Sequence, residues 1–503
     1  MRTCLRFILA AALVVAFATP GGAQRGVTLT IAQPSDATTM DPGRSTQVLT
    51  VNYFHNLYDT LTRWDTNLKL QPALASSWKP AGETVWEVTL RSGVKFHDGT
   101  PFTAEDVKAV YERNLAPGKT VVTAGFATID KIEAVSPTLL RITTKKPDPL
   151  MPVRMAQMGG YIYPKRFAND EGAKELARKP IGTGAYKFVE WIKDDRLVMD
   201  ANREWWGWGG KAPSVDRVIW KPIPDDFARL SALQGNEVDV ITNVPPDQMK
   251  IVRVLTVPAT RTVTMTINAA HPPLKDRRVR QALHYATDIP GIIKNLYAGQ
   301  GKPFSGGLAD TDFGYNPALK PYPYDTAKAK ALLADYGQPV EVTLISGQGT
   351  MINDKQLLEA LADMWGQVGV KAKINMMEMA QRQKMLNDRA IPAGGLLLVN
   401  PQSTLLDADG VLWRIWHPNG FNGKYWAENQ PGRRFHDVME QARYSLDQKK
   451  RNELYTEATR IMHDEKPWLE LFQEVVIYGV SKRTSFKPRA DYRLIVSEMT
   501  IAR

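Results

Sequence analysis

The first residues that could do chemistry are a serine and a lysine at the spacing used by acyl-enzyme hydrolases. Ser76 and Lys79 form a Ser-x-x-Lys match, but enzymes that use this pair also carry Ser-Asp-Asn and Lys-Thr-Gly further along the chain. Neither tripeptide occurs here, and no Gly-x-Ser-x-Gly turn is present. A secreted serine hydrolase is therefore the weaker alternative, and we predict that the protein is not an enzyme.

Metal and nucleotide chemistry have equally little support. No two histidines stand at helical ligand spacing and no His-Glu-x-x-His occurs, although a fold can bring distant histidines together. Gly299-Gln300-Gly301 lacks the third glycine of a dinucleotide loop. We predict neither a resident metal nor a cofactor. The seven histidines are His55, His97, His271, His284, His417, His436 and His463.

Tryptophan is abundant, with 13 residues, and it clusters twice. Trp205, Trp206 and Trp208 form the first cluster, which we interpret as core. The second cluster lies in a stretch rich in Gly, Asn and Pro and comprises Trp413, Trp416 and Trp426. Aromatic side chains on such loops give contact area at low entropic cost and often line clefts. We expect at least one of the second cluster to line a binding cleft.

The elements that must position these residues alternate between strands and helices. Residues 340–344 alternate with period two, 357–365 repeat with helical spacing after a possible cap at Asp354, and 370–376 alternate again. This strand–helix–strand order predicts parallel pairing with a right-handed crossover. Thr103 and Asp106 resemble a capping box, and Gly337 should end a helix that covers 329–336.

Length and composition predict two lobes rather than one. The 503 residues exceed a single core, and 43% hydrophobic with 23% charged residues exclude a disordered, collagen-like or polytopic membrane chain. The formal charge of +11 is spread out, so nucleic acid is not expected as a partner. No linker rich in Pro, Gly or Ser separates the two halves of the chain. Strands near Thr262–Asn268 and Glu474–Val480 are the expected crossings between the lobes, because both have high β-propensity.

The N-terminal residues predict export. Arg2 and Arg6 precede an uncharged run, Phe7–Ala18, which is too short to span a membrane and fits a secretory signal. Cleavage after Ala23 would remove Cys4, the only cysteine. We predict a signal peptide over 1–23 and a periplasmic mature protein without disulfides.

Four segments stand out as motifs, in order along the chain. They are residues 90–107 (LRSGVKFHDGTPFTAEDV), 182–188 (GTGAYKF), 273–288 and 324–333. Together they resemble the periplasmic solute-binding proteins of peptide-type ABC importers, extracellular solute-binding family 5. The first is similar to the family signature, and the second to its Gly-Thr-Gly-Pro-Tyr element, with Ala185 in place of proline. The third resembles the helix after the hinge, and the fourth matches a further element.

The resemblance implies an α/β fold of the type II periplasmic-binding-protein class, with an enlarged first lobe that carries an extra subdomain. Two strand crossings would join the lobes. Lobe I is expected to cover residues 24–262, lobe II residues 263–479, and residues 480–503 are expected to return to lobe I. It also implies a monomeric receptor that captures a peptide or peptide-like solute and delivers it to an inner-membrane permease with cytoplasmic ATPases. A chaperone or signalling receptor on the same scaffold is a further alternative.

One departure limits the choice of substrate. Peptide-binding members hold the peptide amino group with an acid that falls near Thr404 here, whereas Asp407 and Asp409 match the later acidic pair. A buried ammonium without a carboxylate is costly, so a carboxylate, opine, sugar derivative or chelated metal is the alternative ligand. The predicted ligand-binding residues are Asn52, Tyr53, Asn268, His271, Arg382, Trp413, Trp416, Asn422 and Trp426, with Arg382 expected to hold a carboxylate.

Overall fold

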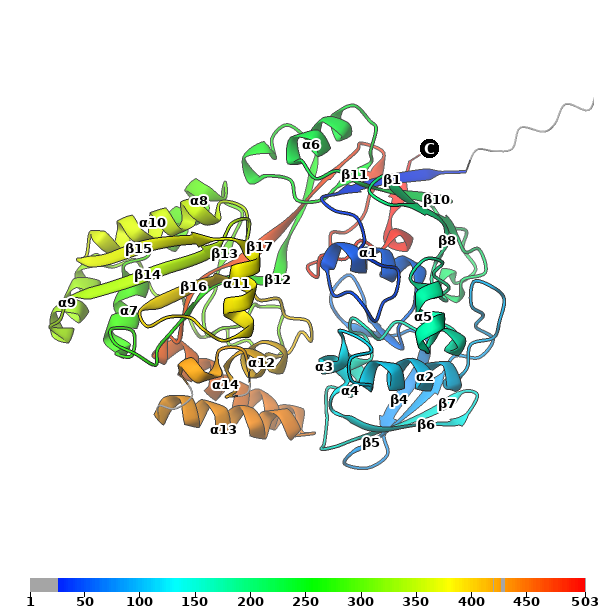
Figure 1. Cartoon of the computed structure of the whole chain (residues 1–503), viewed down its shortest axis with the longest axis horizontal. Helices are drawn as coiled ribbons and strands as arrows, with labels where there is room; N and C mark the ends of the chain where they lie inside the picture. Colours follow the sequence, from blue (N-terminus) through cyan, green and yellow to red (C-terminus); the bar gives the residue numbers. More distant parts are fainter. Residues whose placement is uncertain (1–25, 419, 427–429, 503) are drawn as a thin grey trace, which may run out of the picture.

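The structure is a computed structural model that describes residues 26–418, 420–426 and 430–502. The predicted signal peptide therefore lies outside the described residues. Within them, the chain forms two lobes, each with its own apolar core (Figure 1). The described part of the chain contains no helix with the length and apolar character of a membrane span.

The two cores are built from different stretches of sequence. The larger core takes its buried residues from 29–259 and again from 476–499. The second core takes them from 263–472. The chain thus passes from the first lobe to the second and returns. The predicted two-lobed α/β fold is confirmed, while the residue boundaries of the lobes stay a prediction.

One mixed sheet passes through both lobes. In spatial order its strands are β15 (Val370–Met377), β14 (Val340–Gly347), β16 (Gly395–Val399), β12 (Val254–Ile267), β17 (Trp468–Val480), β11 (Val240–Ile241), β1 (Thr28–Gln33), β10 (Arg217–Pro222), β9 (Arg196–Ala201) and β8 (Tyr186–Ile192), with β13 (Lys302–Pro303) beside β17.

The two long central strands make the crossings. β12 and β17 run antiparallel, with Val254 opposite Gly479 and Thr266 opposite Trp468. β12 also pairs with β16 in the second lobe, and β17 with β11 in the first. Their register shifts between Pro258 and Thr262, where the proline lacks the N–H that a regular ladder needs. The predicted pair of strand crossings is confirmed (Figure 1).

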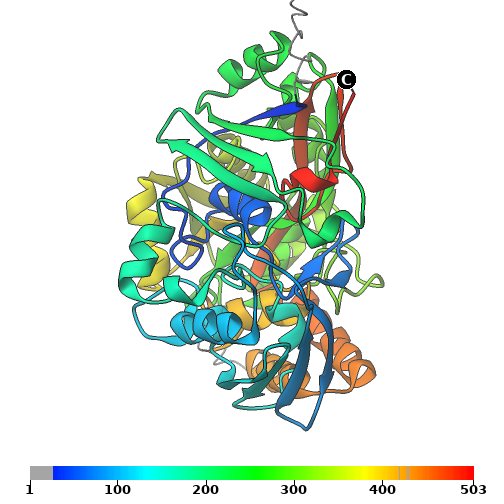
Figure 2. The same cartoon turned by 90° about the vertical axis from the view of Figure 1, so that its right-hand side faces the viewer.

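The first lobe carries a small separate sheet. Its strands, in spatial order, are β4 (Ala75–Pro80), β5 (Val85–Leu90), β7 (Leu139–Thr144) and β6 (Ile129–Ser136). Helix α2 (Ala104–Leu115) packs on it, and the predicted capping box is present, because Thr103 N–H donates to Asp106 Oδ2 at 2.9 Å. Figure 2 shows this subdomain at the end of the molecule opposite helix α6 (Asp226–Gln234).

The second lobe contains the predicted strand–helix–strand unit. β14 and β15 pair in parallel and helix α10 (Asp354–Gly366) connects them. The cap differs from the prediction. Asn353 is the N-cap, and Asp354 is the first helical residue, whose carboxylate accepts a hydrogen bond from Thr350 N–H at 2.9 Å. Gly337 ends helix α9 (Thr326–Tyr336) with φ +74°, as predicted.

The remaining elements cover the sheets or connect their strands. In the first lobe they are α1 (Val48–Leu57), α3 (Thr123–Phe126), α4 (Met151–Arg154), α5 (Asp170–Leu176), β2 (Thr62–Trp64), β3 (Leu70–Pro72), β18 (Thr484–Ser485) and β19 (Thr500–Ile501). In the second lobe they are α7 (Arg277–Tyr285), α8 (Ile289–Leu296), α11 (Met379–Asn387), a π-helix at Asp409–Trp413, α12 (Arg414–Trp416), α13 (Gln430–Tyr444) and α14 (Gln448–Glu465).

Candidate ligand-binding cavity between the lobes

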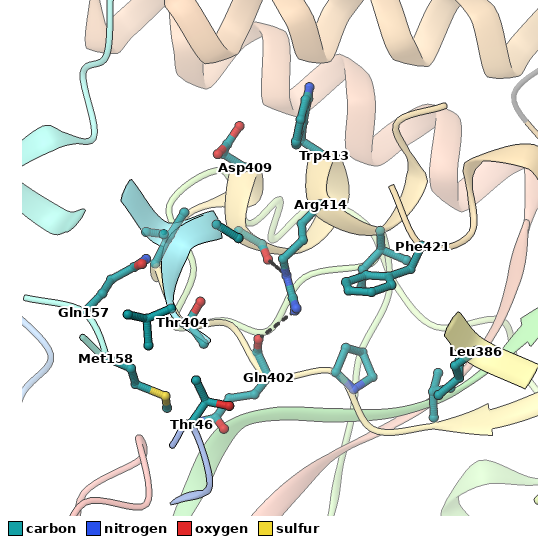
Figure 3. A pocket seen from close by; sticks show the side chains of 18 of the residues that line it. Thr46, Gln157, Met158, Leu386, Gln402, Thr404, Asp409, Trp413, Arg414 and Phe421 are labelled. Carbon is teal, nitrogen blue, oxygen red and sulfur yellow. Dashed lines mark hydrogen bonds between the residues drawn. The ribbon is translucent and has the colours of Figure 1, made fainter. Parts of the chain in front are cut away.

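A cavity of about 750 Å³ lies between the two lobes. The first lobe contributes residues of 46–48 and 121–125 together with Arg154, Gln157 and Met158. The second lobe contributes the larger part of the lining, and Figure 3 shows residues of both lobes around the cavity at close range. The lining residues of the second lobe are Arg382, Gln383, Leu386, Val399, Asn400, Pro401, Gln402, Thr404, Leu405, Asp409, Gly410, Trp413, Arg414, Ile415, Phe421, Asn422 and Arg443.

Most polar groups of this part of the lining come from one irregular segment. After β16, residues 400–405 run along the cavity, and the chain then enters the π-helix Asp409–Trp413. Short π-helical turns are rare and are found at functional sites, because the extra residue per turn reorients side chains. Here the turn places Asp409, Trp413 and Arg414 on the cavity side (Figure 3).

Arg414 extends from this turn across the cavity wall (Figure 3). Its Nε donates to Gly410 O at 2.7 Å and its Nη2 to Gln402 O at 3.2 Å. Both acceptors are neutral backbone carbonyls. Burial lowers the pKa of Arg414 from its ordinary value, which shows that its surroundings disfavour the positive charge. A negatively charged ligand group beside it would compensate that charge.

Arg382 on α11 is the second such guanidinium. It is buried, and its Nη2 donates to Leu398 O at 2.9 Å. Its Nε is buried without a hydrogen-bond partner among the described residues. Burial also lowers the pKa of Arg382. A buried donor that lacks an acceptor is unfavourable, so the group is well suited to receive an acceptor from a ligand.

A third charged group joins the lobes. Arg154, from α4 of the first lobe, donates to Asp148 at 2.7 Å and lies 3.6 Å from Asp409 Oδ2 of the second lobe. Arg443 lies 3.3 Å from the other oxygen of Asp409. Burial raises the pKa of Asp409, and the two arginines act in the opposite direction. Asp409 is thus shared between two cations of the protein itself.

The lining as a whole is positively charged. Its charged side chains are four arginines (Arg154, Arg382, Arg414 and Arg443) and one acid, Asp409. Apolar residues from both lobes, such as Val48, Met158 and Phe421, supply the rest of the wall. This arrangement favours a small anionic solute with apolar parts, because the charges attract carboxylates while the walls bury carbon.

Four of the predicted ligand-binding residues lie at cavities. Arg382, Trp413 and Asn422 line the main cavity. Asn52 lines a smaller adjoining space that shares Val48 and other residues with it, although its Oδ1 also accepts a hydrogen bond from Leu494 N–H at 3.0 Å.

The other five predicted residues are not brought to the cavity, and their surroundings explain why. Tyr53 is buried in the first core, where its hydroxyl accepts a hydrogen bond from Gln33 at 2.7 Å. Asn268 donates to Ile391 O at 2.8 Å. Trp416 and Trp426 pack edge-to-face in the second core, and His271 is exposed on the surface.

Sequence reasoning missed three of the four cavity arginines. Arg414 directly follows Trp413, so the same loop argument would have found it. Arg154 and Arg443 carry no local signal, because only the fold brings them to Asp409.

Asp407 and Asp409, the acidic pair that follows Thr404, already have partners among the protein's own side chains. Thr404 lines the cavity. Asp407 is buried, and it accepts hydrogen bonds from Arg451 and from the Tyr455 hydroxyl, both at 2.8 Å. Since Asp409 is also paired with arginines, the carboxylates of this segment are poorly placed to hold a ligand ammonium.

The Ser76–Lys79 pair is not arranged for nucleophilic catalysis. The Ser76 hydroxyl donates to Thr89 O at 3.1 Å across the small sheet, and Lys79 pairs with Glu87 at 3.6 Å. A serine nucleophile needs a base within hydrogen-bond reach, and this lysine is directed to a carboxylate instead.

Comparisons with known proteins agree on one family. The profile described as "Bacterial extracellular solute-binding proteins, family 5 Middle" matches residues 69–423. The glutathione-binding protein GsiB of Escherichia coli strain K12 is 28% identical over 470 residues, which cover 90% of this chain and 90% of that protein. The periplasmic binding protein DppA of Helicobacter pylori, solved with the peptide STSA, has a TM-score of 0.77 at 24% identity, and the match covers 95% of this chain and 99% of that one. AgaA of A. tumefaciens R10, solved with agropinic acid, has a TM-score of 0.78 at 23% identity with the same coverage.

Proposed function

The chain belongs to family 5 of the bacterial extracellular solute-binding proteins, and from this membership we propose that it is the periplasmic receptor of an ABC importer. It captures a small solute that bears carboxylates between its lobes and delivers it, chemically unchanged, to the permease. Cleavage of residues 1–23 releases the mature receptor, which acts as a monomer.

The observation that carries the proposal is the charge of the cavity. Two arginines of the second lobe, Arg382 and Arg414, direct their hydrogen bonds to backbone carbonyls. A carboxylate is the natural partner for a guanidinium, because the two can form paired, charge-assisted hydrogen bonds. A solute with two carboxylates could engage both arginines at once.

A short peptide with extra carboxylates is the leading ligand. Glutathione, the solute in the name of the GsiB relatives, carries two carboxylates and one ammonium. The uncharged Thr404 and the engaged Asp407 favour ligands that do not depend on a buried ammonium. An opine-like carboxylate is the second candidate, because its carboxylates could pair with the same two arginines.

Binding would proceed by closure of the lobes around the solute. β12 and β17 are the connections about which the lobes can rotate. A ligand shifts the balance to the closed form only through contacts that it makes better in that form. Contacts from Arg154 on the first lobe and Arg414 on the second would supply that difference.

The test is a calorimetric titration of protein that has been unfolded and refolded to remove solute carried through purification. Glutathione, its diethyl ester, an uncharged-side-chain dipeptide and an opine form the panel. We expect tight binding only by compounds with at least two free carboxylates, so the dipeptide, which has one, and the diethyl ester, which has none, should bind weakly. Arg382→Met and Arg414→Met should each weaken binding at least tenfold, because a lost charged hydrogen bond costs about 2–5 kcal/mol. Arg460→Met, on the exposed surface of α14, is the matched control.

Two results would contradict the proposal. Binding of the diethyl ester as tightly as glutathione would show that carboxylates are not recognised. Equal effects of the cavity variants and Arg460→Met would show that the arginines act through the fold and not through the ligand.

A further inference from the structure

Behind the cavity wall, three side chains of metal-ligating type lie together. His417 follows α12, and His436 and Glu440 stand one turn apart on α13. One ligand atom from each lies within 4.8 Å of the other two. None of the three is among the residues that line the cavity, so the cluster is separate from the proposed solute site.

The geometry is close to that of a metal site. His417 Nε2 lies 3.0 Å from Glu440 Oε1, and the rings of His417 and His436 are 4.4 Å apart between centroids, tilted by 52°. Ligands at about 2.0–2.2 Å from a shared zinc ion lie a little over 3 Å from one another. Metal binding would require His436 to rotate until its ligand atom reaches that spacing.

His436 gives an independent indication of a ligand. Its Nε2 is buried and has no hydrogen-bond partner within the described ranges of the chain. Its Nδ1 faces Asp437 Oδ1 at 3.8 Å. Histidines that bind metals use one ring nitrogen for the ion and direct the other at a carboxylate. His436 thus has one buried nitrogen without a partner among the described residues and one nitrogen that faces a carboxylate.

The charged groups around the cluster are compatible with a bound cation. The Glu440 carboxylate supplies a negative charge, and its Oε1 lies 3.0 Å from His417 Nε2. The Arg443 guanidinium is engaged elsewhere, because it lies 3.4 Å from the centre of the Trp413 ring and 3.3 Å from Asp409 Oδ1.

We propose that His417, His436 and Glu440 bind one divalent transition-metal ion, with Zn²⁺ as the expected metal. Two imidazoles and one carboxylate are a donor set that zinc uses, with the fourth position left to water. The ion would rest against the cavity wall, because Glu440 also accepts a hydrogen bond from Trp413 Nε1 at 2.8 Å and His417 stacks on Trp413 at 4.3 Å.

The experiment uses the full mature chain without a histidine tag, stripped of metal with a chelator and dialysed. Zn²⁺ is titrated in competition with a chromophoric chelator of known affinity. We expect one equivalent of Zn²⁺ to bind, and His436→Gln and Glu440→Gln to weaken that binding at least tenfold. His271→Gln, which removes an exposed histidine elsewhere, should leave it unchanged.

A second readout guards against variants that fail to fold. Co²⁺ bound to two histidines and a carboxylate gives visible absorption bands, which the wild-type protein should show and the two variants should lose while keeping the wild-type far-UV spectrum. The proposal is overturned if wild type binds no Zn²⁺, or if folded His436→Gln and Glu440→Gln bind it as tightly as wild type.

Discussion

Buried arginines fall into two groups in this molecule. Arg451 donates to Asp407 at 2.8 Å and Arg489 to Asp491 at 2.7 Å, so each of these guanidinium groups has a carboxylate partner. Arg382 is also buried, but its hydrogen bond goes to the backbone carbonyl of Leu398. The fold therefore pairs these two arginines with carboxylates, whereas Arg382 has no carboxylate partner among the described residues.

This difference predicts opposite effects of the same substitution. Arg451→Met should lower the free energy of unfolding by about 3–5 kcal/mol, because it leaves the buried Asp407 without its cation. Arg382→Met should leave the ligand-free protein equally stable or more stable, because it removes a buried charge that has no counter-ion among the described residues. Urea unfolding at pH 7 without solute measures both, and a similar loss in the two variants would refute the distinction.

Asp312 predicts a pH dependence of stability. Burial, with nearby Asp407, raises the pKa of Asp312 from 3.8 to about 7. The folded protein thus holds this proton more tightly than the unfolded chain, so the contribution of Asp312 to stability falls as the pH rises from about 4 to about 7. Relative to Asp312→Asn, wild type should lose on the order of 4 kcal/mol of unfolding free energy across that range.

Urea unfolding of both proteins at several pH values measures the difference. Burial lowers the pKa of His55 and His284, whose contributions change with pH in the opposite direction. These histidines are present in both proteins and cancel in the comparison. A difference that stays constant between pH 4 and 8 would show that Asp312 is ionised in the folded protein.

At the scale of elements, β17 needs a glycine where it meets the first lobe. A Cβ on Gly479 would lie 2.6 Å from Ile241 Cγ1 and 2.9 Å from Leu233 Cδ2. Gly479→Ala should therefore lower the free energy of unfolding by about 1–3 kcal/mol, because packed side chains must move. Gly366→Ala in α10 meets nothing within 4 Å and should be neutral or stabilising. Thermal unfolding compares them, and equal melting temperatures would contradict the steric argument.

The regular elements were predictable because their residues repeat with a fixed period. The strands around 340 and 370 alternate, and both are found, with α10 between them. β12 begins at Val254, eight residues before the predicted crossing. The sequence pattern did not indicate this first part, because Pro258 interrupts the β-prone run, and in the structure the register shifts there. The π-helix at Asp409–Trp413 follows neither the α-helical period nor the strand period. This turn, which contributes residues to the cavity lining, therefore could not be predicted from the sequence.

The candidate site was predictable only in part for a related reason. Trp413 and Asn422 belong to a loop whose composition indicates a binding surface, and both line the cavity. Trp416 has the same local setting but turns into the core, where it packs against Trp468. Local composition therefore identifies the segment but not the direction of each side chain. Arg154 reaches the site from the other lobe, a relation that no local pattern contains.

At the scale of the molecule, the lobes already touch at one end of the cavity. Arg154 lies near Asp409, and Lys146 Nζ is 4.7 Å from the centre of the Tyr444 ring. We expect a saturating carboxylate ligand to draw the lobes together and reduce the radius of gyration measured by small-angle X-ray scattering. Arg154→Met should weaken both the binding and this compaction. An unchanged radius at saturation would argue against closure.

Both described ends of the chain belong to the first lobe. β1 begins at Thr28, and β19, near the other end, pairs with β18 of the same lobe (Figure 1). Fluorescent proteins fused to the two termini would thus both be attached to the first lobe. The distance between them would change little when the lobes move about the hinge. An optical biosensor made from this receptor needs at least one fluorophore grafted into the second lobe, and the exposed surface of α14 offers room for it.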